Sequence, residues 1–112
     1  MPKFLLLLHH DPSGFMKLSP EEMQKTTEKY MEWTRRPFVV DSNRLMGEPG
    51  RVIRANNGQP RSTDGPYSET KEILGGYYTI EAASYDDAVK LSMDHPHLAN
   101  GGTVEVRRVF EM

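Results

Sequence analysis

The longest apolar run in the chain, FLLLL at residues 4–8, is only five residues long. A transmembrane helix needs about 20 apolar residues and the core of a signal peptide about 7–15, so this run fits neither. Because side chains alternate between the two faces of a strand, an unbroken apolar run predicts a strand that is covered on both faces. We therefore place a central strand at residues 3–8 and expect a cytoplasmic protein with no membrane partner.

Two helices are predicted from the residues that begin them. The sequence SPEE at residues 19–22 combines a capping box with proline at the first helical position, and Pro37 ends that helix. Helical spacing puts Met23, Thr27, Tyr30 and Thr34 on a stripe that we expect to be buried, with Met31 and Trp33 beside it. Ser84 begins a second helix, which runs to about residue 94 and stops before Pro96.

The other predicted elements are strands. Asn57-Gly58 predicts a hairpin between residues 51–55 and 59–63, because both turn positions tolerate positive φ, and Pro60 makes the returning strand an edge strand. Residues 77–82 and 103–110 alternate in polarity, and residues 38–40 are a further short candidate. The order β-α-β-β-α-β predicts one ferredoxin-like α+β domain over residues 1–112, with both helices on one face of a four-stranded antiparallel sheet.

Such a sheet has a second face that no helix covers. Hydrophobic residues make up 37% of the chain, and some of them must lie on that second face. A large exposed apolar patch is unusual in a monomer. We therefore expect a homodimer in which two sheets pack face to face around a two-fold axis and form a dimeric α+β barrel.

Charge and composition exclude several classes of partner and cofactor. Fourteen basic and sixteen acidic residues give a net charge of -2, so the chain has no basic field that would attract nucleic acid. The absence of cysteine excludes disulfides, thiolate nucleophiles and cysteine-based metal sites. Gly75-Gly76 lacks the spacing of a dinucleotide fingerprint, and no pair of histidines has helical metal-ligand spacing. We expect no bound cofactor.

The four histidines are the candidate acid/base groups. His9 and His10 follow the first strand, where they are either solvated residues at a strand end or members of an acid/base or metal site. We interpret His95 as a capping or packing residue at the end of the second helix. His97 lies in the connection to the last strand, as a solvated loop residue or a site residue, and both interpretations stay open.

The polar motif Asp64-Gly65-Pro66-Tyr67 precedes a dense polar segment at residues 68–72 and then Gly75-Gly76. A plain turn followed by a short polar helix or turn explains every residue type in it. The alternative is a small pocket, in which the glycines allow a ligand to approach the backbone.

The stretch TDGPYSETKE at residues 63–72, followed by LGGYY, resembles the signature of the YCII-related family in its DGPF-type branch, with Tyr67 in place of the usual phenylalanine. Residues 96–107 are also similar to the closing segment of that family. The resemblance implies a dimeric barrel of ferredoxin-like protomers. A His–Asp acid/base pair is suggested for some members, and the matching positions here are Asp64 and His97.

Two functional hypotheses follow. In the first, the protein is an enzyme acting on a small molecule in the barrel cavity. Asp64 raises the basicity of His97, Lys71 or Arg107 holds an anionic or carbonyl group, and Tyr67 forms a wall of the pocket. In the second, the protein is a non-catalytic metabolite-binding or regulatory dimer. Some relatives implied by the resemblance are associated with extracytoplasmic-function sigma factors.

Overall fold

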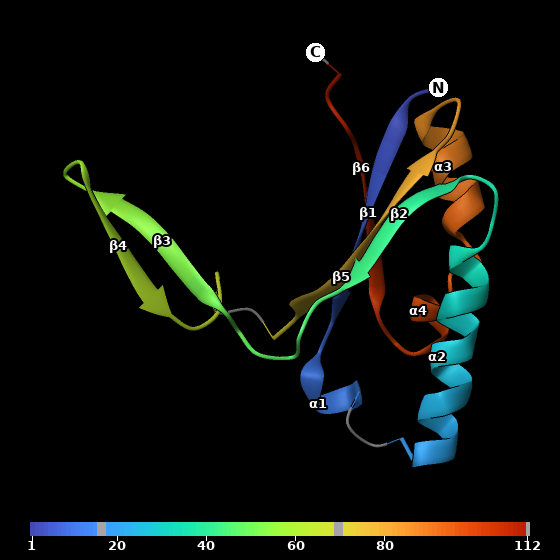
Figure 1. The fold of residues 1–112 in the computed structure, drawn as a ribbon, viewed down its shortest axis with the longest axis horizontal. Coiled ribbons are helices and arrows are strands. Elements are labelled where there is room, and N and C mark those ends of the chain that lie inside the picture. The colour runs from blue at the N-terminus through green and yellow to red at the C-terminus, as the bar shows by residue number, and fades with distance from the viewer. Residues whose placement is uncertain (16–17, 69–70, 112) are drawn as a thin grey trace.

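A computed structural model describes residues 1–15, 18–68 and 71–111 of the chain (Figure 1). The described elements follow in the order β1 (Lys3–His10), α1 (Pro12–Phe15), α2 (Pro20–Thr34), β2 (Val39–Arg44), β3 (Arg51–Asn56), β4 (Gln59–Asp64), β5 (Ile73–Glu81), α3 (Tyr85–Ser92), α4 (Pro96–Ala99) and β6 (Thr103–Arg108). None of the described helices has both the length and the apolar character needed to cross a bilayer.

Four strands form an antiparallel sheet in the order β2-β5-β1-β6. The fold is therefore α+β, and the strand order is compatible with the predicted ferredoxin-like arrangement. The apolar run lies in β1, which is an inner strand as predicted. The edge position beside β5 belongs to β2, which extends the short candidate at residues 38–40 to Arg44.

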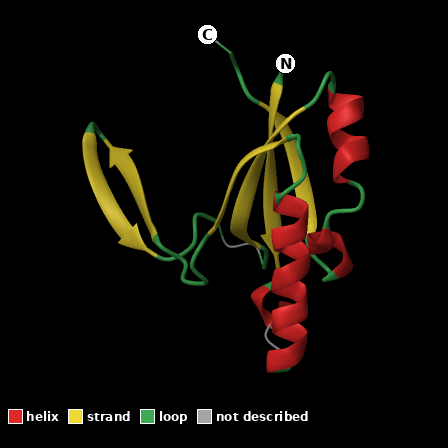
Figure 2. Ribbon diagram, turned by 45° about the vertical axis from the view of Figure 1, so that its right-hand side comes forward, coloured by secondary structure: helices red, strands yellow, loops and turns green. Residues whose placement is uncertain are grey.

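The predicted hairpin forms, but it is not part of this sheet. Strands β3 and β4 make a separate two-stranded sheet, and the turn residues Asn57 and Gly58 have φ of 53° and 78°. The expectation that the hairpin supplies a sheet strand is wrong because β2 already occupies the edge of β5. We call residues 51–64 the hairpin arm, and Figures 1 and 2 show it projecting from the side of the sheet opposite the helices.

The core lies between the four-stranded sheet and the helices, on what we call the covered face. Alternate residues of the inner strands point into it: Phe4, Leu6 and Leu8 from β1, and Tyr78 and Ile80 from β5. Trp33 of α2 completes the core, with its ring packed edge-on against Phe38 and Tyr78. The alternation of β5 thus confirms the face assignment made from the sequence.

The helix boundaries follow the capping residues. Ser19 caps α2 by accepting a hydrogen bond from the Glu22 backbone N–H at 3.2 Å, and Ser84 caps α3 through Asp87 in the same way. The predicted second helix is α3, which ends at Ser92, and Pro96 begins the short α4, which the sequence patterns did not predict. Of the predicted polar segment at residues 68–72, Glu69 and Thr70 lie outside the described residues, and the described ones are not helical.

The methionines do not fill the core as the helical spacing predicts. Met23 and Met31 of α2 are about half exposed, and Met93 is 68% exposed. Trp33 is the buried residue of α2, while Tyr30 and Thr34 are half-buried. The reason is that one large aromatic side chain fills the space between α2 and the sheet near the helix C-terminus, so that most of the earlier turns stay in solvent.

Candidate functional site

His97 is buried on the covered face, where both of its ring nitrogens have partners. Its Nε2 lies 2.7 Å from the backbone oxygen of His9, and its Nδ1 lies 2.8 Å from the hydroxyl of Tyr30. Because a carbonyl oxygen only accepts, Nε2 carries the proton and the Tyr30 hydroxyl donates to Nδ1. The side-chain N–H of Asn100 donates in turn to the Tyr30 oxygen at 3.3 Å. Burial lowers the pKa of His97, so this network holds it as a neutral ring.

Two glycines make room for histidine rings, one buried (His97) and one half-buried (His10). A Cβ built on Gly102 would lie 2.2 Å from Nε2 of His97, and one built on Gly75 would lie 2.5 Å from Cε1 of His10. The register of β1 on β5 also shifts between Leu8 and His9, a bulge that leaves Gly75 without an opposite residue. The space above Gly75, which the sequence suggested for a ligand, is thus filled by the chain's own imidazole.

The packing role predicted for His95 is confirmed, but the residue caps the start of α4 and not the end of the second helix. It is 1% exposed, and its Nδ1 accepts the backbone N–H of His97 at 3.1 Å as the N-cap of α4. The ring packs against Trp33 and Tyr78 at centroid distances of 4.5 and 4.7 Å. Burial in this aromatic surrounding, with the nearby charge of His97 as a second cause, lowers its pKa to about 4.

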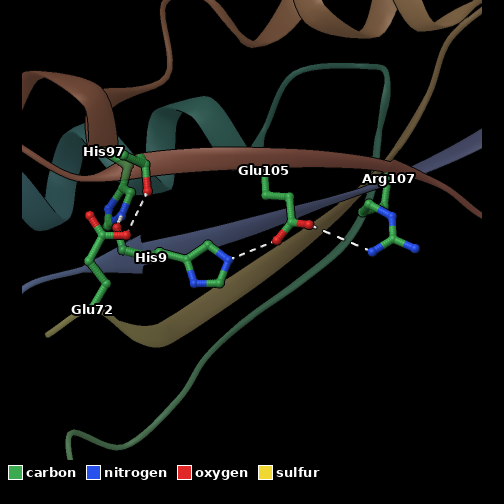
Figure 3. Close-up of polar contacts among 6 residues, drawn as sticks. His9, Glu72, His97, Glu105 and Arg107 are labelled. Atoms are coloured by element: carbon green, nitrogen blue, oxygen red, sulfur yellow. Dashed lines mark hydrogen bonds and ion pairs between the residues drawn. The ribbon is translucent and has the colours of Figure 1, made fainter. Parts of the chain in front are cut away.

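The other face of the sheet, which we call the open face, carries a second polar arrangement. Nε2 of His9 lies 3.0 Å from Oε1 of Glu105, and NH1 of Arg107 lies 3.6 Å from the other oxygen of the same carboxylate (Figure 3). The side chain of His9 is 28% exposed, so a solute can reach it. This histidine–carboxylate pair is accessible, whereas His97 is not.

Strand register brings these three residues together. On β1 and β6, Leu5 is opposite Arg107, Leu7 is opposite Glu105, and His9 follows Leu7 on the same face. His9 is therefore the diagonal neighbour of Glu105, a position within reach of a long side chain. The sequence places Glu105 and Arg107 on one strand face, but their closeness to His9 depends on a register that the sequence does not state.

The rest of the open face is less apolar than we expected from the sequence. Leu5, Leu7 and Tyr77 are half-buried there, and charged or amide residues surround them. Asn43 donates to the Tyr77 hydroxyl at 2.8 Å, and that hydroxyl lies 3.4 Å from a carboxylate oxygen of Asp41. A surface of this kind can hold a polar ligand, because oriented donors and acceptors stand among apolar side chains.

The predicted site residues lie in separate parts of the chain. Asp64 ends β4 in the hairpin arm, where it pairs with Nε of Arg51 at 3.3 Å, far from α4 and His97. Tyr67 is 80% exposed, and its ring stacks on the guanidinium of Arg54. Lys71 is exposed in the loop before β5, while Arg107 lies on the open face. Within a single chain, Asp64 and Tyr67 thus contact arginines of the arm and are not beside His97.

Two hollows are lined by other residues than the His9–Glu105 pair. One of about 660 Å³ at the base of the arm is lined by Glu48, Pro49, Gly50, Arg51, Asp64 and Gly65. Another of about 400 Å³ lies between α2 and the α3–α4 connection and includes Trp33, Arg36, Asp94 and His95. In the latter, Asp94 is engaged by Arg36 at 2.7 Å and by the Trp33 indole N–H at 3.1 Å. No group of three or more potential metal ligands occurs among the described residues.

These observations define a small α+β protein with an antiparallel sheet, one helix-covered face and one open face that bears a histidine–carboxylate pair. The model of the YCII-related domain matches residues 3–112, and the chain belongs to this family. It is also 41% identical over 60 residues to Uncharacterized protein R00369 of Rhizobium meliloti (strain 1021). That match covers 50% of this chain and 46% of the relative, so less than half of the relative's length is matched.

Proposed function

We propose that the open face is the working surface of a small-molecule acid/base site, with His9 as the proton-transfer residue. The observation that carries the proposal is the 3.0 Å hydrogen bond between His9 and Glu105 on a solvent-accessible part of the sheet. A carboxylate that accepts from one imidazole nitrogen fixes the tautomer and stabilises the protonated ring. The remaining nitrogen is then the one that takes a proton from a substrate.

The roles of the neighbours follow from their positions. Glu105 accepts from Nε2, so Nδ1 is the basic nitrogen of the neutral His9 ring. Arg107 forms an ion pair with the same carboxylate of Glu105, and its side chain is 67% exposed. Its other N–H groups are therefore available to an anionic or carbonyl oxygen of a ligand. The substrate class that fits is a small molecule with a carboxylate or a polarised carbonyl and an acidic proton nearby.

His97 has a positioning role in this proposal. It holds the backbone oxygen of His9 at 2.7 Å, at the point where the β1–β5 register shifts. The sequence-based pairing of Asp64 with His97 is not part of this proposal, because His97 is buried on the covered face with both ring nitrogens bonded and Asp64 pairs with Arg51 in the arm. We retain Asp64, Tyr67 and Lys71 as substrate-side residues only in a dimer.

The cavity itself requires a second copy. We assign the chain to the DGPF-type branch on residues 63–72, and propose that two ferredoxin-like protomers pair through their open faces as a dimeric α+β barrel. Leu5, Leu7 and Tyr77 provide apolar contact in the pair, and the polar residues around them supply the lining of the enclosed space. Enclosure strengthens the His9–Glu105 interaction, because it removes competing water.

A specific observation favours one alternative. Arg107 and the Asn43–Tyr77–Asp41 cluster are suited to hold a polar ligand whether or not a proton moves. A metabolite-binding or regulatory dimer would use the same open face without turnover.

The test is a screen followed by matched variants. A panel of small carboxylates and carbonyl compounds is tested for binding by ligand-observed NMR, and each ligand found is then tested for turnover. His9→Gln removes the proposed proton-accepting nitrogen and is expected to lower turnover by roughly 10²–10⁴-fold with binding retained. Arg107→Gln is expected to weaken binding, whereas Arg108→Gln, on the neighbouring residue of the same strand, is the control.

The outcomes separate the candidates. Turnover that survives in His9→Gln contradicts the acid/base role. Binding that depends on Arg107 without turnover of any ligand in wild type selects the binding alternative. Ligand binding that neither His9→Gln nor Arg107→Gln changes contradicts the choice of the open face.

A further inference from the structure

The hairpin arm lacks the support that a folded hairpin needs. Every side chain of β4 is exposed, and in β3 only Val52 is half-buried. A two-stranded hairpin alone is marginally stable in water and needs a third strand or a packed helix. Its strands hydrogen-bond only to each other in the described sheet topology. The two strands of the arm pair with each other, but nearly all of their side chains are exposed. The surface of the arm is therefore available for another molecule to cover.

The arm also makes the chain less compact than its length requires. The radius of gyration is 16.0 Å, whereas a compact domain of this length has about 13 Å. The two longest dimensions are 45 and 43 Å and the third is 18 Å. Figures 1 and 2 attribute the extension to the arm, which projects away from the sheet and the helices.

The direction of the arm indicates what it contacts. It projects on the side of the open face, which is where a second protomer must lie in the proposed sheet pair. Packed sheets are about 10 Å apart, and a strand of six residues is about 20 Å long. An arm of that length therefore extends beyond the middle of the pair and lies against the body of the second protomer.

The distribution of charge also favours a second copy of the chain as the partner of the arm. The arm contains three arginines and one aspartate, a net charge of +2. The remaining residues have 11 basic and 15 acidic side chains, a net charge of -4. An arm and a body of opposite charge within one sequence favour the approach of the arm of one copy to the body of another. Arg54 and Arg61 lie on the face of the arm away from Ile53, so this charge acts on the approach and not on the apolar contact.

We propose that the hairpin arm binds the body of a second copy of this chain, each protomer holding its partner beside the space between the open faces. The contacting side is the one that bears Ile53, Ala55 and Pro60, which share one face of the arm. Ile53 is 73% exposed and is the largest apolar side chain of that face. The proposal rests on the sheet pair of the proposed function and adds the arm as a second, reciprocal contact.

The proposed arm contact also predicts where the Asp64-Gly65-Pro66-Tyr67 motif lies in the dimer. Asp64 and Arg51 line the hollow where the arm leaves the body, and Tyr67 stacks on Arg54 of the arm. When the arm lies against the partner, these residues lie at the entrance to the shared cavity. The cavity is thus bounded by residues of both protomers, and it is incomplete in one chain.

Mixed-label NMR tests the contact directly, because the chain has no cysteine. Ser62→Cys on the Ile53 side of the arm is labelled with a nitroxide in unenriched protein and mixed with ¹⁵N-labelled wild type. Broadened amides in the enriched chain can arise only from another copy. We expect broadening in one contiguous part of the partner's body, absent after reduction of the nitroxide.

Dimer dissociation measured by light scattering over a dilution series supplies the second test. Ile53→Asp is expected to raise the dissociation constant at least ~10-fold, as the loss of an apolar interface anchor does. Gln59→Asp, on the other face of the arm, is the matched control and is expected to change it less than ~3-fold. Thermal unfolding of both variants verifies that the body remains folded.

The result that overturns the arm contact is a wild-type dimer with no intermolecular broadening and no difference between Ile53→Asp and Gln59→Asp. Broadening that occurs only in a separate sample, in which the nitroxide-bearing chain is itself ¹⁵N-labelled, and not in the mixed sample, also overturns it, because the arm then folds onto its own body. A wild type that remains monomeric at all concentrations overturns the sheet pair as well. The first two results leave the sheet pair of the proposed function standing.

Discussion

The two faces of the four-stranded sheet use histidine in opposite ways. On the covered face, His95 and His97 are 1% and 2% exposed, and burial lowers the pKa of both. On the open face, His9 is reachable by solvent and hydrogen-bonds to a carboxylate. The comparison shows that burial makes His95 and His97 neutral structural groups, whereas His9 has an accessible ring beside a carboxylate, which is the arrangement on which the proposed proton transfer rests.

His9 is also the residue at which the two faces meet. Its backbone oxygen is bound by the buried His97, and its side chain lies among the polar groups of the open face. The shift of register between Leu8 and His9 occurs at this same point. The hydrogen bond from His97 on one face thus fixes the backbone from which the His9 side chain extends on the other face.

The largest expected difference between the faces concerns two neighbouring leucines. Leu6 is fully buried on the covered face, and Leu7 lies half-buried on the open face. Leu6→Ala should lower the free energy of unfolding by about 2–5 kcal/mol at every protein concentration, because it leaves a cavity. Leu7→Ala should have an effect that grows with protein concentration, because its contacts form in the pair. Denaturant unfolding at two concentrations measures both; equal, concentration-independent losses would contradict the comparison.

Gly102→Ala tests how tightly the covered face holds His97. The new Cβ meets the imidazole at 2.2 Å, so either the ring or the strand must move, at a cost of about 1–3 kcal/mol in unfolding free energy. Gly47→Ala is the control, since nothing lies within 4 Å of its Cβ position. In the double variant with His97→Ala, the loss should be smaller than the sum of the single losses, since the clash is removed. Additive losses would mean that the ring is not the obstacle.

Sequence patterns predict the covered face better than the open one. The apolar run of β1, the caps at Ser19 and Ser84, the Asn57-Gly58 turn and the alternation of β5 depend on local geometry, and all are present. The burial of Met23 was predicted wrongly because helical spacing gives a face but not the extent of the sheet beneath it.

The candidate site was harder to predict for a related reason. His9 and Glu105 are 96 residues apart, and only the pairing of β1 with β6 makes them neighbours. The separate position of the arm depended on β2 occupying the edge of β5, which the polarity of residues 39–44 did not indicate. Long-range register is a tertiary property, so a local pattern does not contain it.

The buried histidines make the covered face sensitive to acid. The pKa of His95 is about 4 in the folded protein and near 6.5 in the unfolded chain, so between these values the unfolded chain binds more protons. Stability is therefore full above about pH 7 and is lost as the pH falls, by about 2 kcal/mol at pH 5 from this residue alone. His97 adds to the loss in the same direction.

The matched variant for this pH dependence is His95→Asn. Asparagine accepts the His97 backbone N–H as an N-cap but does not titrate. Denaturant unfolding between pH 5 and 8 should therefore give a flatter profile for the variant than for wild type. Asp94 and Arg36 face the same ring and act in opposite directions on it, so both must stay in place. Parallel profiles for variant and wild type would show that His95 is not the source.

The smallest expected effect on stability is that of His9→Ala on the open face. The His9–Glu105 contact is solvent-accessible, and exposed ion pairs contribute about 0–1 kcal/mol, so unfolding should change by less than about 1 kcal/mol. His97→Ala should cost more, because it leaves the buried His9 carbonyl and Tyr30 hydroxyl without their hydrogen-bond partner. Chemical denaturation at pH 8 compares the two variants. A loss from His9→Ala as large as that from His97→Ala would make His9 a structural residue, and would remove the distinction between the faces on which its assignment to proton transfer depends.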